Sequence, residues 1–334
     1  MVTVKLLVTG GAGFIGSNYV RWVLANTDDE VTVYDALTYA GNLSTLADVE
    51  ERVGPGRYRF IQGDICDPVA VAEVVAGTDG VVHFAAESHV DRSIVGAADF
   101  VLTNCVGTNV VMDACLKAGV SRVLHVSTDE VYGSVEHGHS LETDPLDPRS
   151  PYSSSKAGSD LIARSYFSTH GLPVMITRSS NNFGPWQYPE KVIPLFTTNL
   201  LDGLRVPLYG DGLNARDWLY VEDNCAGVDF VLRSGEAGEI YNLGAGNELS
   251  NRDLTDRLLA LAGAGEEMVE YVTDRLGHDR RYSVDSTKLR SLGWRPQRQL
   301  DEALEATFAW YRDNRWWWEP LKAGSSPVRP VPAP

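Results

Sequence analysis

The 334-residue chain lacks an excess of positive charge, because 29 lysines and arginines stand against 45 aspartates and glutamates and give a formal net charge of −16. Proteins that bind nucleic-acid polymers do so mainly through clustered basic side chains, so we expect no such partner. A small anionic ligand in a local basic pocket is not excluded. The hydrophobic fraction of 43% and the charged fraction of 22% are typical of globular proteins and exclude disordered, collagen-like and coiled-coil chains.

Long apolar runs and paired cysteines are also missing. No apolar run approaches the roughly 18 residues that a membrane span needs, and the first ten residues lead directly into a strand-like segment, which leaves no room for a signal peptide. The cysteines form no CxxC pair and no spacing typical of a metal knuckle or a disulfide framework; they are Cys66, Cys105, Cys115 and Cys225. We therefore expect free thiols in a reducing compartment, no membrane partner and a cytoplasmic protein.

The first half of the chain alternates short β-branched runs with longer helical patterns. Continuous apolar strands separated by helices are typical of a parallel sheet covered on both faces, so we predict an α/β fold with a doubly wound parallel Rossmann sheet. The predicted strands are Val4–Val8, Val31–Tyr34, Tyr58–Ile61, Val81–Phe84, Val123–Val126 and Val174–Thr177. The predicted helices are Ser17–Ala25, Pro68–Val75, Ala97–Ala118 and Ser153–Thr169.

The second half is rich in turn-forming residues from Ser179 onward and predicts a smaller α/β substrate-binding lobe. Within it we expect the strand Ile240–Leu243 and the helices Arg252–Ala262 and Leu300–Arg312. The expected division is a Rossmann domain over residues 1–178, which part of 218–243 can join, a lobe over 179–322 and a disordered tail over 323–334.

A glycine-rich segment follows the first predicted strand and opens the first helix, with Gly10, Gly13 and Gly16 in a GxxGxxG spacing. Missing side chains allow a tight turn and the close approach of a pyrophosphate to backbone N–H groups. Asp35 ends the second predicted strand, where a carboxylate accepts hydrogen bonds from ribose hydroxyls and repels a 2′-phosphate. The pattern therefore predicts a dinucleotide site that prefers NAD over NADP. Asp64-Ile65, after the third strand, either brackets the adenine or forms an ordinary turn.

Tyr152 and Lys156 lie at i and i+4 of a predicted helix and therefore share one face. A nearby ammonium favours the phenolate, so we expect Lys156 to lower the tyrosine pKa and make Tyr152 a base near neutral pH. Thr128, Asp129 and Glu130 follow the fifth predicted strand, at the sheet edge where doubly wound folds bind ligands. Thr128 can bind a substrate hydroxyl, and two neighbouring carboxylates in different environments can divide into acid and base. An exposed turn after a strand and an ordinary amphipathic helix are the alternatives.

Together these residues resemble the extended short-chain dehydrogenase/reductase family, in its nucleotide-sugar branch, over roughly residues 3–322. Three motifs look most like those of the dTDP-glucose 4,6-dehydratases: Ser127–Gly133 (STDEVYG), Ala86–Ser93 (AESHVDRS) and Ser180–Pro185 (SNNFGP). The resemblance implies an NAD-dependent hydro-lyase that forms dTDP-4-keto-6-deoxyglucose by oxidation at carbon 4, elimination of water across carbons 5 and 6 and reduction at carbon 6. It implies tightly bound NAD that is regenerated in every turnover.

The resemblance also implies residue roles. Tyr152 takes the 4-hydroxyl proton, Glu130 is the base at carbon 5, and Asp129 protonates the departing 6-hydroxyl. Cofactor contacts are expected from Gly10, Gly13, Phe14, Ile15, Gly16, Asp35, Thr38, Asp64, Ile65, Ala85, Ala86, Ser88, Tyr152, Lys156 and Asn181. Substrate contacts are expected from Ser88, Thr128, Asn181, Lys191, Arg216, Asn251, Arg275 and His278. The planar fork of Arg216 suits a phosphate.

Several alternatives stay open at this point. Another nucleotide-sugar 4,6-dehydratase, a 4-epimerase or a decarboxylase uses the same fold, and an NAD-binding regulator without catalysis is a different class. Helices near 97–118 and 153–169 form the dimer interface in this family, which implies a homodimer, although from pattern alone they could equally be core. His89 reads as a packed polar residue, and His137 and His139 have no third ligand, so no metal is expected. Trp316–Trp318 is either an interaction patch or the packing face of a terminal helix.

Overall fold

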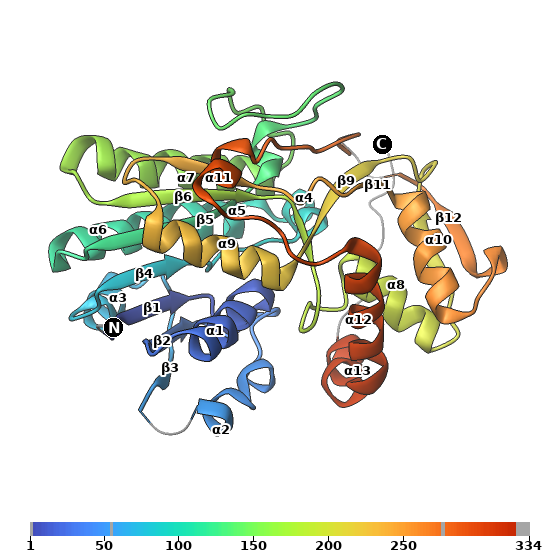
Figure 1. Cartoon of the computed structure of the whole chain (residues 1–334), viewed down its shortest axis with the longest axis horizontal. Coiled ribbons are helices and arrows are strands. Elements are labelled where there is room, and N and C mark those ends of the chain that lie inside the picture. Colours follow the sequence, from blue (N-terminus) through green and yellow to red (C-terminus); the bar gives the residue numbers. More distant parts are fainter. Residues whose placement is uncertain (1–2, 54–55, 275–277, 325–334) are drawn as a thin grey trace.

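A seven-stranded parallel sheet forms the centre of the computed structural model, which describes residues 3–53, 56–274 and 278–324 (Figure 1). The strand order is β10-β6-β5-β4-β1-β2-β3. The strands are β1 (Lys5–Thr9), β2 (Glu30–Asp35), β3 (Tyr58–Gln62), β4 (Gly80–His83), β5 (Arg122–Thr128), β6 (Val174–Ser179) and β10 (Ile240–Leu243). All seven predicted strands are present within two residues of their predicted bounds. The prediction of a doubly wound Rossmann sheet is therefore confirmed.

Helices cover both faces of this sheet (Figure 1). Apolar side chains of α1 (Phe14–Asn26), α9 (Val221–Ser234) and α11 (Thr287–Leu292) pack in one buried cluster with the strands. Those of α3 (Pro68–Val75), α6 (Thr108–Ala118) and α7 (Pro151–His170) form a second cluster. Shorter elements lie in the connections: Leu43–Leu46, α2 (Val49–Val53), α4 (Val90–Val95), α5 (Ala97–Val101) and Asp129–Tyr132. The carboxyl ends of the strands stay available at one edge, where ligands bind in this fold class.

The helix predicted over Ala97–Ala118 is wrong as a single element, because the π-helical turn Leu102–Gly107 separates α5 from α6. Gly107 lies directly against Ile65, whose Cδ1 would be 2.5 Å from a Cβ at this position. The turn also buries the Asn104 side chain. A π-helical turn inserts one extra residue into a helix and is frequently found at functional sites. Sequence periodicity alone does not register such an insertion.

The smaller lobe is built from two minor sheets and the later helices. A three-stranded sheet has the order β11-β9-β7 and consists of β7 (Asn181–Phe183), β9 (Ala215–Tyr220) and β11 (Glu248–Ser250). The strands β8 (Val206–Tyr209) and β12 (Val269–Val272) pair in parallel, and Glu266–Met268 is a short 3₁₀ turn. The helices are α8 (Val192–Leu201), α10 (Asn251–Ala262), α12 (Leu300–Asp313) and α13 (Arg315–Gly324). The predicted tail from residue 323 lies outside the described residues, except for the last two residues of α13.

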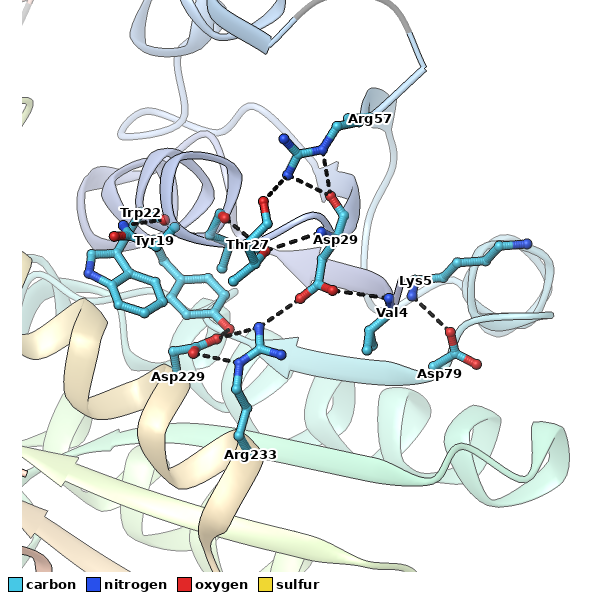
Figure 2. Close-up of polar contacts among 12 residues, drawn as sticks. Val4, Lys5, Tyr19, Trp22, Thr27, Asp29, Arg57, Asp79, Asp229 and Arg233 are labelled. Atoms are coloured by element: carbon cyan, nitrogen blue, oxygen red, sulfur yellow. Dashed lines mark hydrogen bonds and ion pairs between the residues drawn. The ribbon is translucent and has the colours of Figure 1, made fainter. Parts of the chain in front are cut away.

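Helix α9 follows lobe residues in the chain, yet it is fixed to the Rossmann part by polar contacts at the far end of the sheet (Figure 2). Arg233 on α9 donates to Asp229 at 2.6 Å and to Asp29, in the turn before β2, at 2.7 Å. The Tyr19 hydroxyl on α1 donates to Asp229, and Asp29 accepts the backbone N–H of Val4. These contacts, together with the parallel pairing of β10 with β6, join residues 221–243 to the main sheet.

Within the described residues, no helix combines the length and the apolar character that crossing a bilayer requires.

Candidate active site

The glycine turn between β1 and α1 has no room for side chains. Gly10 has a φ of +71°, and a Cβ on it would lie 2.5 Å from the Ala85 backbone nitrogen. A Cβ on Gly16 would lie 2.2 Å from the Gly10 carbonyl oxygen. Gly13 caps α1 without a side-chain hydrogen bond, and the first turn of α1, which begins with Phe14 and Ile15, carries no acidic residue. The backbone N–H groups there are open to an anion, which fits the pyrophosphate of a dinucleotide.

Asp35 lies beside this turn at the end of β2. Its carboxylate accepts hydrogen bonds from the backbone N–H of Ala12 at 2.9 Å and from that of Leu37 at 2.8 Å. Burial raises the pKa of Asp35, and the two backbone hydrogen bonds oppose that shift. Thr38 is exposed in the following loop. A carboxylate fixed over the glycine turn is placed to meet the ribose of a bound dinucleotide.

We expect Asp35→Ser to weaken NAD binding about tenfold or more, because a charge-assisted hydrogen bond contributes about 1.5–3 kcal/mol. The preference for NAD over NADP should fall as well, because the repulsion of the 2′-phosphate is lost. Titration of cofactor-free protein with both dinucleotides measures this. Asp79→Ser is the matched control: Asp79 precedes β4 at the amino ends of the strands, is exposed, and accepts the N–H of Lys5. Equal NAD affinity in wild type and Asp35→Ser would contradict the assignment.

The remaining predicted cofactor residues lie in two segments, one after β3 and one after β4. Ile65 is buried against Gly107 in the core, whereas Asp64 beside it is exposed. Ala85, Ala86 and Ser88 lie in the segment that follows β4, next to the glycine turn. Sequence reasoning missed the residue that holds this segment: Asn104 accepts the N–H of Glu87, and its amide donates to the Glu87 carbonyl and to Ser155 Oγ at 2.8 Å.

Helix α7 carries Tyr152 and Lys156 at its amino end. The helix begins at Pro151 because Ser150 and Ser153 form a reciprocal capping box. Both functional side chains are buried, and Lys156 Nζ donates to the Val126 carbonyl on β5 at 2.7 Å. The two predicted residues thus share one face of α7 beside the end of β5.

In the protein without its cofactor, the pKa of Tyr152 lies above its ordinary value, not below it as expected. Burial raises the pKa of Tyr152, and the nearby charge of Glu130 raises it further. Lys156 is itself affected, because burial lowers its pKa to about 8. Its ammonium is directed at a backbone carbonyl instead of at the phenol. A further positive charge is therefore needed to make Tyr152 a base near neutral pH.

Asp129 and Glu130 occupy the 3₁₀ turn that follows β5, in different environments. Asp129 is buried and accepts the Thr128 hydroxyl, whereas Glu130 is partly exposed. Burial raises the pKa of Asp129 well above its usual value, as do the charges of Glu130 and Asp217, while Arg216 opposes the shift. Asp217 is a buried carboxylate on β9 that sequence reasoning missed. Asp129 is accordingly suited to carry a proton and act as an acid.

Arg216 on β9 faces this turn from the lobe. Its guanidinium donates to the Ala215 carbonyl at 2.8 Å and to the Asp279 carbonyl at 2.9 Å, and it lies 4.2 Å from the centre of the Tyr282 ring. Carbonyl groups orient the guanidinium without neutralising its charge, so Arg216 remains suited to a phosphate. The charge of Glu130 also contributes to the raised pKa of Tyr282, which links this side of the lobe to the catalytic turn.

Two more predicted substrate residues, Lys191 and Asn181, lie where the lobe follows and contacts the Rossmann part. Lys191, just before α8, donates from Nζ to the Ser88 carbonyl at 2.9 Å. Asn181 begins β7, which pairs with β9 at Trp218. Its amide oxygen is buried and has no hydrogen-bond partner among the described residues, so it is available to a ligand.

The other predicted substrate residues lie farther out in the lobe. Asn251 begins α10 directly after β11. His278 Nδ1 lies 2.7 Å from Asp274 Oδ1, and its ring packs edge-on against Tyr209. His278 also lines a cavity of about 410 Å³ together with Arg280 and Arg281. Arg275 lies outside the described residues.

The structure also shows the surroundings of the histidines and tryptophans for which the sequence left alternatives open. His89 is buried beside Glu190, and His139 Nδ1 lies 2.6 Å from Ser283 Oγ. The described ranges contain no cluster of three or more side chains that could hold a metal. Trp317 and Trp318 are buried in an aromatic cluster with Trp186, while Trp316 is exposed. The terminal helix therefore packs on the body through two of its three tryptophans.

Comparisons with known proteins match dehydratases that act on nucleotide sugars. The family model described as GDP-mannose 4,6 dehydratase matches residues 7–307. The dTDP-glucose 4,6-dehydratase of Streptomyces antibioticus is 55% identical over 99% of this chain and 98% of that protein. The solved structure of DesIV, a dTDP-glucose 4,6-dehydratase from Streptomyces venezuelae with NAD and TYD bound, is 56% identical with a TM-score of 0.92, covering 95% of this chain and 99% of that one.

A structure from the alternative reaction class is more distant. The UDP-glucose 4-epimerase of Thermus thermophilus in complex with NAD is 32% identical, with a TM-score of 0.85, and covers 93% of this chain and 99% of that one.

Proposed function

Because the chain belongs to the family of dTDP-glucose 4,6-dehydratases, we propose that it is an NAD-dependent hydro-lyase that converts dTDP-glucose to dTDP-4-keto-6-deoxyglucose. The reaction oxidises carbon 4, eliminates water across carbons 5 and 6 and reduces carbon 6, so it loses one water without net oxidation. The observation that carries the proposal is the pairing of a buried Asp129, whose pKa is raised by burial, with a partly exposed Glu130 beside Tyr152 and Lys156.

The residues present fit NAD as the cofactor, because the glycine turn leaves open backbone donors and Asp35 stands over it. When bound, NAD⁺ supplies the acceptor for the hydride of carbon 4, returns that hydride to carbon 6, and adds the positive charge that favours the Tyr152 phenolate. Regeneration of NAD in every turnover follows from the closed redox balance, and we propose that NAD stays tightly bound throughout. The set of cofactor contacts predicted from the sequence stands as part of this proposal.

The chain's own residues move the protons. Tyr152 takes the proton of the sugar 4-hydroxyl, and Lys156, held by the Val126 carbonyl, stabilises the phenolate. The ketone at carbon 4 acidifies carbon 5, from which Glu130 removes a proton. Asp129 gives its proton to the 6-hydroxyl, which leaves as water. Thr128 orients the sugar by hydrogen bonding to one of its hydroxyls.

Binding of the nucleotide sugar falls mainly to the lobe. Arg216 is oriented by backbone carbonyls and takes the diphosphate, Lys191 adds a second cation, and Asn181 offers its unpartnered side-chain oxygen. Ser88, Asn251, Arg275 and His278 complete the proposed substrate set. In this division of labour, residues 1–178 hold NAD together with 221–243, and the rest of 179–322 closes over the sugar.

Incubation of the purified protein with dTDP-glucose and no added NAD⁺ tests the proposal. Mass spectrometry should show a product lighter by one water, and alkali should reveal the absorbance of a 4-keto sugar. An epimerase would give a product of unchanged mass, and an NAD-binding regulator would leave the substrate as it was. A product of unchanged mass, or no product, would refute the proposed reaction. The same assay with other nucleoside diphosphate glucoses as substrates measures the preference for the nucleotide base.

We also propose a homodimer through the helices near 97–118 and 153–169. Each of these helices has a buried face, yet Val101, Leu102, Val106 and Leu161 are 45–58% exposed on neighbouring elements. An apolar patch of this kind marks an interaction surface, and two copies can cover it by isologous packing.

Leu161→Glu is expected to convert the dimer to monomers, because it places a charge in the apolar interface. Sedimentation equilibrium measures the mass in solution. Leu204→Glu is the matched control, since Leu204 is similarly exposed, at 51%, but lies outside these helices. A wild-type monomer, or a Leu161→Glu dimer as tight as the wild type, would contradict the interface.

We also propose that the protein acts in the cytoplasm. The four cysteines are free thiols, which fits a reducing compartment, and we place the reaction in the cytoplasm.

A further inference from the structure

Arg178 forms a buried junction between two catalytic segments. It lies on β6 and is 3% exposed. Its Nε donates to Asp160 Oδ2 on α7 at 2.9 Å, and its Nη1 donates to the Tyr132 hydroxyl at 2.8 Å. The guanidinium also lies over the Tyr132 ring, 4.7 Å from its centre. The two ends of one planar group therefore hold two side chains from different elements.

The Asp160 end of the junction belongs to the helix that bears the oxidation residues. Tyr152, Lys156 and Asp160 follow one another at intervals of four residues, so they share one face of α7. Burial raises the pKa of the Asp160 carboxyl, but its interactions with His125 and Arg178 outweigh burial and hold it below the usual value. The ionised Asp160 opposes the loss of charge on Lys156.

The Tyr132 end belongs to the turn that bears the elimination residues. Tyr132 is the last residue of the 3₁₀ turn that begins with Asp129 and continues with Glu130. Its hydroxyl donates to Asn242 Oδ1 on β10 at 2.9 Å, so the turn is tied to the edge strand of the sheet as well. Arg178 thus links the turn that carries Asp129 and Glu130 to α7, the helix that carries Tyr152 and Lys156.

We propose that Arg178 is a positioning residue for elimination, which through Tyr132 fixes the turn of Asp129 and Glu130 relative to the helix of Tyr152 and Lys156; the proposal rests on the proposed dehydratase function. A buried ion pair contributes little net stability, since desolvating both charges costs about as much as their attraction gains. Its distinctive effect is geometric, because the rigid guanidinium directs separate N–H groups at two partners. The step that depends on both segments at once is the loss of water.

Tyr132→Phe and Arg178→Lys test the proposal. The phenylalanine keeps the ring over the guanidinium but removes the hydroxyl, and the lysine keeps the charge beside Asp160 but loses the planar fork. Under single-turnover conditions with dTDP-glucose, we expect the formation of the 4-keto-6-deoxy product to slow by about 10-fold to 100-fold, as misplacement by about 1 Å does in enzymes. Reduction of the bound cofactor, read from NADH absorbance, should change less than about threefold, so NADH accumulates. The KM for dTDP-glucose should stay near that of the wild type.

Tyr241→Phe is the matched control. Tyr241 precedes Asn242 on β10, is equally buried, and its hydroxyl accepts the Glu236 N–H at 2.9 Å. A purely structural effect would lower thermal stability in the control and in the test variants alike, and would slow both steps in proportion.

Unchanged partition between NADH formation and product formation in Tyr132→Phe would overturn the proposal, even if Arg178→Lys fails to fold. Accumulation of NADH in the Tyr241 control to the same extent would overturn it too. Failure of the proposed function shows differently, because the wild type itself would then release no dehydrated product, and the positioning role would fall with it.

Discussion

Asp129→Asn is expected to leave oxidation of the sugar intact and to slow the loss of water about 10²–10⁴-fold, the usual contribution of a general acid. Asparagine cannot protonate the departing 6-hydroxyl, whereas the buried Asp129 is suited to this role because burial and the charges of Glu130 and Asp217 raise its pKa. Rapid mixing with dTDP-glucose should show NADH formation at the wild-type rate and an intermediate that has not yet lost water. Elimination at the wild-type rate would contradict the acid role.

Glu130→Gln provides the companion measurement for this prediction. In deuterated water, Asp129→Asn should still exchange the hydrogen at carbon 5, because Glu130 remains as the base. Glu130→Gln should lose that exchange while it still forms NADH. The two variants therefore separate the base from the acid within one carboxylate pair.

The Asp129→Asn substitution should also stabilise the fold at neutral pH. The native state favours the protonated form of Asp129, so its pKa is higher in the folded than in the unfolded chain. The folded state then binds more protons above the unfolded value of about 3.9, and stability falls as the pH rises through that window. Asp129→Asn removes this penalty, so its melting temperature should exceed that of the wild type near pH 8. The difference should disappear as the pH approaches about 4.

Tyr152→Phe is expected to abolish the reaction one step earlier, with a fall in kcat of about 10³-fold or more, because phenylalanine has no hydroxyl to take the proton of the sugar 4-hydroxyl. Neither NADH nor exchange at carbon 5 should be detectable, in contrast to Asp129→Asn. Tyr166→Phe is the control on the same helix, since the Tyr166 hydroxyl donates to Asn109, away from the site. NADH formation by Tyr152→Phe would show that another group removes the proton.

The sequence predicted the main sheet well because its strands are continuous apolar runs between helices. Helix α9 escaped prediction for a physical reason: polar residues on its buried face interrupt the apolar period. Asn224 accepts the Ser179 hydroxyl, and Asp229 meets Tyr19 and Arg233. Partners that distant in the chain satisfy these groups only after folding. These polar residues obscure the pattern, although Val221, Cys225, Val228 and Val231 keep a helical spacing that could have predicted α9.

The candidate site was predictable where its chemistry is local. The segment Thr128–Glu130, the Tyr152–Lys156 pair and the glycine turn are each contained in a few neighbouring residues. The direction of the shift in the Tyr152 pKa was not predictable in this way. It depends on burial and on the charge of Glu130, and only the fold brings Glu130 close to Tyr152. Asp217 and Arg178 reach the site from β9 and β6, and the spacing of neighbouring residues gives no indication of such contacts.

The late position of α9 and β10 in the chain also governs how the protein can be made. A ribosome must complete the chain to Leu243 before the seventh strand can join the sheet and before Val228 and Val231 can cover its face. Until then a nascent chain exposes an apolar surface that invites chaperones or aggregation. We therefore expect that a gene fragment cut at residue 178 does not fold as an independent cofactor-binding module, and that a split version of the protein needs its break beyond β10.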